Sequence, residues 1–109
     1  MNSPKLFDEQ IKKDLNIPDR YSQEDKGDEA VVYCKFFDIL GSWVWYVTEA
    51  DKEGDDYTFF GLVDGFEVEL GYFALSEFLS INEKFPRIER DLYFTPITLG
   101  ELRQELNSR

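Results

Sequence analysis

Five carboxylates and one lysine occupy six of the eight positions of EADKEGDD, residues 49–56, and carboxylates at this density could hold a metal ion. Every second residue from Asp51 to Asp55 is acidic, as at the start of an EF-hand calcium loop. An EF-hand also requires glycine at its sixth position and glutamate at its twelfth. Counting from Asp51, these positions hold Asp56 and Leu62. The spacing therefore predicts no metal site, and it favours an acidic hairpin loop that stays in water.

Other reactive groups are few. The sequence contains no histidine, which removes the usual general base, the Ser-His and Cys-His nucleophile pairs and the histidine ligands of most zinc sites. Cys34 lies on the same face of a predicted strand as Val32 and Phe36, so we expect its thiol to be buried. Glu67 and Glu69 alternate on one predicted strand, about 6.6–6.8 Å apart at Cα, which leaves carboxylate-only glycoside chemistry formally open. We expect no catalytic residue and no cofactor.

Charge is concentrated in the middle of the 109-residue chain, whose net charge is -11. Residues 30–79 carry ten acids and two bases, whereas residues 80–109 carry five of each. The clustered Lys and Arg that contact phosphates are missing, so direct nucleic-acid binding is not expected. With 42% hydrophobic residues the chain can build one packed domain, residues 1–109. It has no membrane-span pattern and no signal-peptide pattern, and its single cysteine fits a reducing cytoplasm.

Periodicity predicts the elements that must position these groups. Ser3 and Pro4 indicate the start of an amphipathic helix over residues 4–15. AVVYCKFF (30–37) and SWVWYVTE (42–49) are β-branched and aromatic, and DILG between them reads as a hairpin loop. Trp43 and Trp45 share a strand face with Val47, which favours a place in the core.

A second hairpin is predicted from YTFFGLV and FEVELGYF, which are separated by Asp64 and Gly65. Asp-Gly favours a two-residue type I′ turn. This turn would place Val63 opposite Phe66 and Phe59 opposite Leu70. Alternation then puts one apolar set on the core face, namely Tyr57, Phe59, Val63, Phe66, Val68 and Leu70. Glu67 and Glu69 would lie on the other, mixed face.

The rest of the chain alternates between helix and strand. Residues 75–85 have helical spacing, residues 88–94 read as a short strand, and Thr98 with Glu101 forms a capping-box signal for a C-terminal helix. The expected fold class is α+β, with a four- to five-stranded, mainly antiparallel sheet and two or three short helices.

Several blocks resemble an uncharacterised family of short acidic bacterial proteins that are commonly encoded on plasmids and integrated mobile elements. The blocks are KGDEAVVYCKFF, WVWYVTEAD, YTFFGLVDGFEVELGYFALSE and IERDLYFTPITLGEL. The resemblance spans residues 4–104 and implies a cytoplasmic bacterial protein with a role on a mobile element. It supplies no catalytic residue.

The functional hypothesis is an acidic protein-binding module whose carboxylates meet a basic protein. The candidate partner-binding residues are Asp55, Asp56, Asp64, Glu67 and Glu69. A narrower version is DNA mimicry, in which carboxylates replace phosphates and block a host nucleic-acid-binding protein; immunity to a basic toxin is related. The alternatives are a soluble domain whose acids only keep it in solution, or a small carboxylate-based enzyme. The partner's identity and the oligomeric state stay open.

Overall fold

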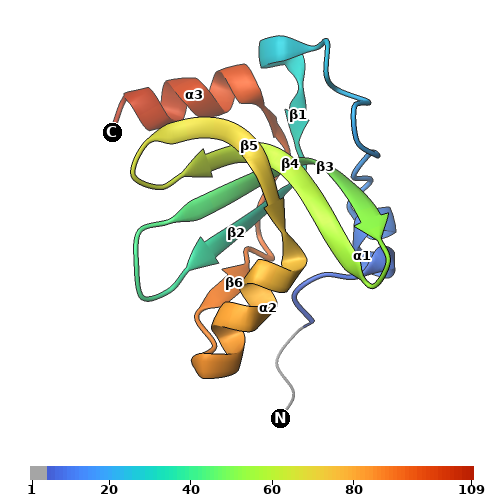
Figure 1. Cartoon of the computed structure of the whole chain (residues 1–109). Coiled ribbons are helices and arrows are strands. Elements are labelled where there is room, and N and C mark those ends of the chain that lie inside the picture. Colours follow the sequence, from blue (N-terminus) through green and yellow to red (C-terminus); the bar gives the residue numbers. More distant parts are fainter. Residues whose placement is uncertain (1–4) are drawn as a thin grey trace.

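Two antiparallel sheets and three helices form the α+β fold that the sequence predicts, as the computed structural model of residues 5–109 shows (Figure 1). The main sheet has the order β5-β4-β3-β2-β6, made of β2 (Cys34–Asp38), β3 (Val44–Glu53), β4 (Asp56–Asp64), β5 (Val68–Ala74) and β6 (Ile88–Arg90). A second sheet pairs β1 (Val31–Val32) with β7 (Ile97–Thr98). The helices are α1 (Glu9–Asp14), α2 (Leu75–Lys84) and α3 (Leu99–Asn107), with a 3-10 turn η1 (Gly27–Glu29).

The helix ends show how well local signals specify structure. At α3 the Thr98 hydroxyl accepts a hydrogen bond from the backbone N–H of Glu101 (3.2 Å), which confirms the predicted cap. α2 begins and ends close to its predicted bounds. α1 is shorter than predicted: Asp8 caps it by accepting from Ile11 N–H (2.8 Å), and the expected start at Ser3 and Pro4 lies outside the described residues.

The main sheet is covered on both faces. α2, α1 and the segment before α1 cover a cluster rich in aromatic rings, centred on Phe36, Phe59 and Phe78. α3 lies over the opposite face, where Leu62 packs with Leu99 and Leu102. Figure 1 shows α2 and α3 on opposite sides of the sheet. A strand in the middle of this sheet therefore buries side chains of both parities, and simple alternation does not identify a single core face.

The predicted register of the β4–β5 hairpin is wrong. Asp64 is itself the last residue of β4 and pairs with Val68, so Gly65, Phe66 and Glu67 form a three-residue loop. The physical reason is that Asp64 is buried in an ion pair with Arg109. The register shift is odd, so the side chains of β5 change faces. Tyr57 and Phe59 are buried as predicted and Val63 is half-buried, but Phe66, Val68 and Leu70 are exposed, while Phe73 enters the core.

The acidic segment is also not the loop that the sequence predicts. β3 continues to Glu53 and β4 begins at Asp56, so only Gly54 and Asp55 form the turn. Gly54 has a φ of 62°, which glycine adopts without strain.

The remaining core predictions hold in part. Cys34 is buried, as predicted. Trp43 and Trp45 are both only half-buried, although the Trp45 ring lies against Phe78 at 4.9 Å between centroids. β6 is shorter than the predicted strand 88–94. None of the helices in residues 5–109 has the length and apolar character needed to cross a membrane.

Candidate protein-interaction surface

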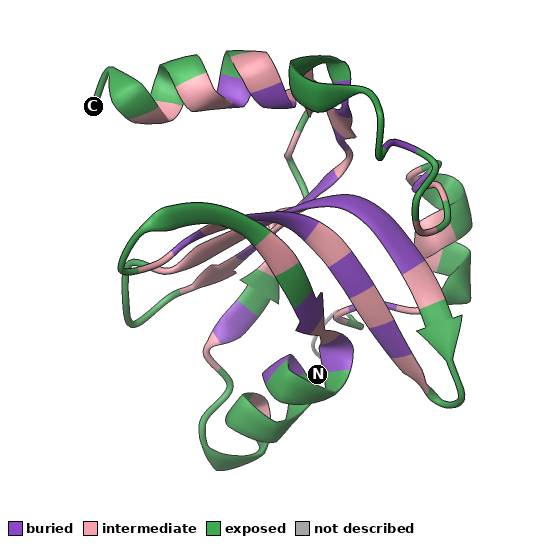
Figure 2. Cartoon of the chain, turned by 45° about the horizontal axis from the view of Figure 1, so that its top comes forward, coloured by how far each residue is buried: buried purple, intermediate pink, exposed green. Residues whose placement is uncertain are grey.

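β5 is an outermost strand of the main sheet, and most of it is exposed (Figure 2). Its free side has no strand partner within the described residues, so a row of backbone N–H and C=O groups faces outward. Exposed apolar side chains accompany this edge: Phe66, Val68, Leu70 and Tyr72. Together with Glu67 and Glu69 they form what we call the β5 surface.

The loop before β5 holds Phe66 outside the core. Its ring meets Trp43 edge to face, with centroids 5.2 Å apart, yet the residue remains 95% exposed. A Cβ at Gly65 would lie 2.6 Å from the Trp43 ring, so this position needs glycine to let the indole lie across the loop. The tryptophan therefore supports a projecting phenylalanine instead of entering the core itself.

Further along β5, Tyr72 packs beside Phe60 of β4, with ring centroids 4.9 Å apart. The Arg20 guanidinium lies 5.7 Å from the Tyr72 ring centre, within the range of a cation–π contact. A small cavity of about 190 Å³ lies between the side chains of Phe60, Leu70 and Tyr72 and the connection that leads to β1. The β5 surface thus continues into a shallow hollow.

The candidate residues near the β4–β5 loop divide into two groups. Glu67 and Glu69 are exposed, as a partner-binding role requires. Asp64 instead forms a bidentate ion pair with Arg109, at 2.6 and 3.0 Å, and its side chain is only 8% exposed. Asp64 and Glu69 do not form one charged face, because Glu69 pairs with Val63 and therefore has the opposite parity to Asp64.

Asp55 and Asp56 lie at the other end of the β4 strand. Asp55 is exposed in the β3–β4 turn. Asp56 accepts hydrogen bonds from the backbone N–H (2.9 Å) and hydroxyl (2.7 Å) of Ser76, in the first turn of α2. Partial burial raises the pKa of Asp56, but these bonds and a further one from the backbone N–H of Tyr57 (2.7 Å) outweigh it and bring the pKa below its ordinary value. Asp56 therefore has a structural role at the helix start, and it is separated from Glu67 and Glu69 by the length of β4.

The other acids of EADKEGDD hold the polar connection that precedes β1. Glu49 accepts hydrogen bonds from the backbone N–H groups of Tyr21 (2.8 Å) and Gln23 (2.9 Å). Asp51 accepts from the N–H of Arg20 (3.0 Å), and Glu53 forms an ion pair with the Arg20 guanidinium. Three alternate carboxylates on one strand thus fix one loop. The sequence gives no sign of this structural role, because the groups that these carboxylates bind lie 26–33 residues away along the chain.

In the part of the chain that the structure describes, no side chains are assembled into a site for metal binding or thiol chemistry. No group of three or more His, Cys, Asp or Glu side chains there could hold a metal ion. Burial raises the pKa of the Cys34 thiol to about 12, so its reactive thiolate is scarce at neutral pH.

Comparison with known proteins places the chain in a family. Residues 6–101 match the model of a family described as protein of unknown function (DUF2958). The chain belongs to this family. The DUF2958 match includes every strand of both sheets and ends inside α3, so the β5 surface lies within it and Arg109 lies outside it. No curated protein and no solved structure matches the chain.

Proposed function

We propose that this DUF2958 chain is a small acidic protein-binding module of the cytoplasm, and that a basic protein docks on the β5 surface. The observation that carries the proposal is the combination of an open sheet edge with four exposed apolar side chains. An exposed apolar edge strand promotes aggregation unless a partner or a blocking residue meets it. Strand addition would satisfy the outward backbone groups, and the apolar side chains would supply the buried contact area.

The charge of the partner follows from the acids beside this edge. Glu67 and Glu69 are exposed next to Phe66, Val68 and Leu70, in a chain of net charge -11. Lys or Arg on the partner would therefore gain attraction during approach, and this long-range attraction weakens as salt screens it. The apolar contacts depend much less on salt.

DNA mimicry is the narrower version of this proposal. The carboxylates of Asp51, Glu53 and Asp64 bind arginines of the same chain, which leaves fewer acids to imitate phosphates. Competition by duplex DNA for the captured partner separates this version from a purely protein-directed surface. Carboxylate enzymology ranks lower, because Glu67 and Glu69 do not line the cavity beside β5.

Site-specific photocrosslinking tests the proposal. A photoreactive amino acid replaces Leu70 on β5 in one variant and Leu79, an exposed residue of α2, in the matched control. We expect the position-70 variant to crosslink a discrete basic protein in host lysate and the position-79 variant not to do so. The captured protein is then purified for direct binding measurements.

Binding of the purified partner decides the result. Leu70→Glu and the double change Glu67→Lys/Glu69→Lys should each weaken binding at least about tenfold, which corresponds to roughly 1.4 kcal/mol. The double-lysine effect should shrink as the ionic strength rises past about 0.15 M, where the Debye length is about 8 Å. Equal crosslinking at positions 70 and 79, or full binding by Leu70→Glu, would refute the β5 surface as the docking site.

A further inference from the structure

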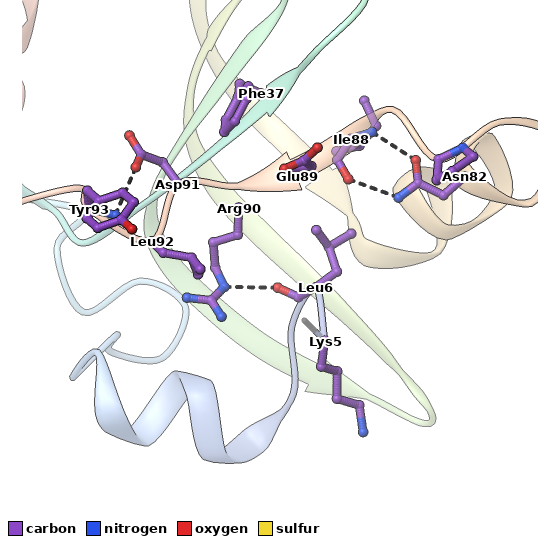
Figure 3. A pocket seen from close by; sticks show the side chains of 11 residues that line it. Lys5, Leu6, Phe37, Asn82, Ile88, Glu89, Arg90, Asp91, Leu92 and Tyr93 are labelled. Atoms are coloured by element: carbon purple, nitrogen blue, oxygen red, sulfur yellow. Dashed lines mark hydrogen bonds between the residues drawn. The ribbon is translucent and has the colours of Figure 1, made fainter. Parts of the chain in front are cut away.

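A cavity of about 440 Å³ lies along β6, at the edge of the main sheet opposite β5 (Figure 3). Its walls include the apolar side chains of Leu6, Phe37, Ile88, Leu92 and Tyr93. Leu92 and Tyr93 are largely exposed to solvent. The volume falls within the range of about 300–1,000 Å³ that is typical of small-molecule sites.

Arg90 gives this cavity its chemical character. The other four arginines of the chain each form an ion pair with a carboxylate: Arg20 with Asp51 and Glu53, Arg87 with Asp38, Arg103 with Asp28, and Arg109 with Asp64. Arg90 has no such pair among residues 5–109, although the chain contains 23 acids. It is half-buried, and its Nε–H donates to the carbonyl oxygen of Leu6 (3.1 Å).

The single bond to Leu6 uses one of the five guanidinium N–H donors and fixes the direction of the side chain. The terminal nitrogens then offer the two parallel donors that match a carboxylate. Figure 3 shows the Nε atom of Arg90 directed at the carbonyl oxygen of Leu6, while the Lys5 side chain extends away from the guanidinium. The Lys5 ammonium lies 3.7 Å from a carboxylate oxygen of Asp8, so Arg90 is the cation that the cavity offers to an acid.

The two acids of the cavity lining lie apart from this donor group. Glu89 has the opposite parity to Arg90 and is paired with Phe37, so these two residues line the cavity from the opposite side of β6 to Arg90. Asp91 lies 3.9 Å from the Lys35 ammonium and accepts the backbone N–H of Tyr93 (2.9 Å). Both acids still lower the local potential, which disfavours a doubly charged phosphate more than a singly charged carboxylate.

We propose that this cavity binds a carboxylate attached to an apolar group, with the carboxylate on Arg90 and the apolar group against Leu6, Ile88 and Leu92. Two sources share this chemistry: a free aliphatic or aromatic acid, and the C-terminal carboxylate of a peptide that ends in a large apolar residue. The site lies on the opposite edge from the β5 surface, so the two proposals stand or fall separately.

Titration of the ¹⁵N-labelled protein with matched probes tests the site by NMR. The probes are 3-phenylpropionate with its uncharged amide, and N-acetyl-Ala-Leu-Phe with a free or an amidated C-terminus. We expect saturable shifts at the backbone of Leu6, Phe37 and Arg90 with the acids and much weaker shifts with the amides. The relative affinity of the free acid and the peptide acid identifies the source of the ligand.

Two variants and one control assign the binding to Arg90. Arg90→Met should weaken acid binding at least about tenfold, whereas Arg103→Met, which removes an arginine of α3, should leave it unchanged. Leu92→Trp fills the cavity mouth without altering Arg90 and should also weaken binding, so the proposal stays testable if Arg90→Met fails to fold. Absence of saturable shifts with both acids at millimolar concentration, or equal affinity for acid and amide, would overturn the proposal.

Discussion

Gln23 donates its backbone N–H to a carboxylate oxygen of Glu49 at 2.9 Å, and both residues are buried. The Gln23 side chain also donates to the carbonyl oxygens of Val31 (2.9 Å) and Thr48 (2.8 Å), and it accepts from Val31 N–H (2.6 Å). Glu49 and Gln23 thus join the polar connection to both sheets.

Replacement of Glu49 by alanine should destabilise the protein by about 1–3 kcal/mol, because the buried N–H of Gln23 and the partly buried N–H of Tyr21 lose a charged acceptor. Glu69→Ala is the matched control, because it removes an exposed acid from the same sheet and should change the free energy of unfolding by less than about 0.5 kcal/mol. Urea denaturation measures both values. Equal effects would show that Glu49 is not a structural acceptor.

The register of the β4–β5 hairpin predicts unequal effects for two phenylalanines. Phe59→Ala should cost roughly 3–5 kcal/mol, since the side chain is fully buried. Phe66→Ala should cost no more than about 1.5 kcal/mol, the value of its edge-to-face contact with Trp43. Thermal and urea unfolding compare them, and strong destabilisation by Phe66→Ala would favour the two-residue turn instead.

Two glycines that face each other across β4 and β5 form a natural test pair. A Cβ at Gly61 would overlap the backbone carbonyl of Tyr46, so Gly61→Ala should cost about 3 kcal/mol or more. A Cβ at Gly71 meets no atom within 4 Å, so Gly71→Ala should be neutral or stabilise by up to about 1 kcal/mol. Denaturant midpoints give both results, and similar midpoints would contradict this close approach of β3 to β4.

Cys34 predicts a pH dependence of both reactivity and stability. Burial raises its pKa from 9.0 to about 12, so the folded state keeps the proton while the unfolded state releases it. The stabilising contribution is complete below pH 9 and is lost as the pH rises from about 9 to 12. A thiol reagent at pH 8 should react slowly with the native protein and rapidly in urea. Cys34→Ser tests the stability effect, because the loss of stability across this pH window should be smaller in the variant.

Sequence reasoning succeeds where a structural signal is local. The Thr98–Glu101 cap, the helical spacing of residues 75–85 and the β-branched runs of the first two main-sheet strands each predict an element that the structure contains. Sequence reasoning fails where the local structure depends on residues that are distant in the sequence. Asp64 has the local pattern of a turn residue, but Arg109 holds it in the strand, 45 positions away.

The same distinction explains the candidate site. Alternation predicts that Glu67 and Glu69 are exposed, but on a register that is wrong, and it assigns the neighbouring side chains of Phe66, Val68 and Leu70 to the core. The cavity at β6 has no local signal, because it combines Leu6, Phe37 and residues 88–93. It is distinguished by the absence of a carboxylate partner for Arg90 among residues 5–109, and pairing of this kind is invisible before the fold is known.

The Asn82 side chain affects how copies of the protein can associate. Its amide donates to the carbonyl oxygen of Ile88 (3.0 Å) and accepts from Ile88 N–H (2.9 Å), as an adjacent strand would. The edge of the sheet at β6 is therefore short, and the Asn82 side chain already bonds part of its backbone, while the edge at β5 stays open. If two copies paired through their β5 strands, neither would keep an open sheet edge, so assembly would stop at a dimer. The same asymmetry that leaves room for a partner therefore protects the protein against growth into fibres.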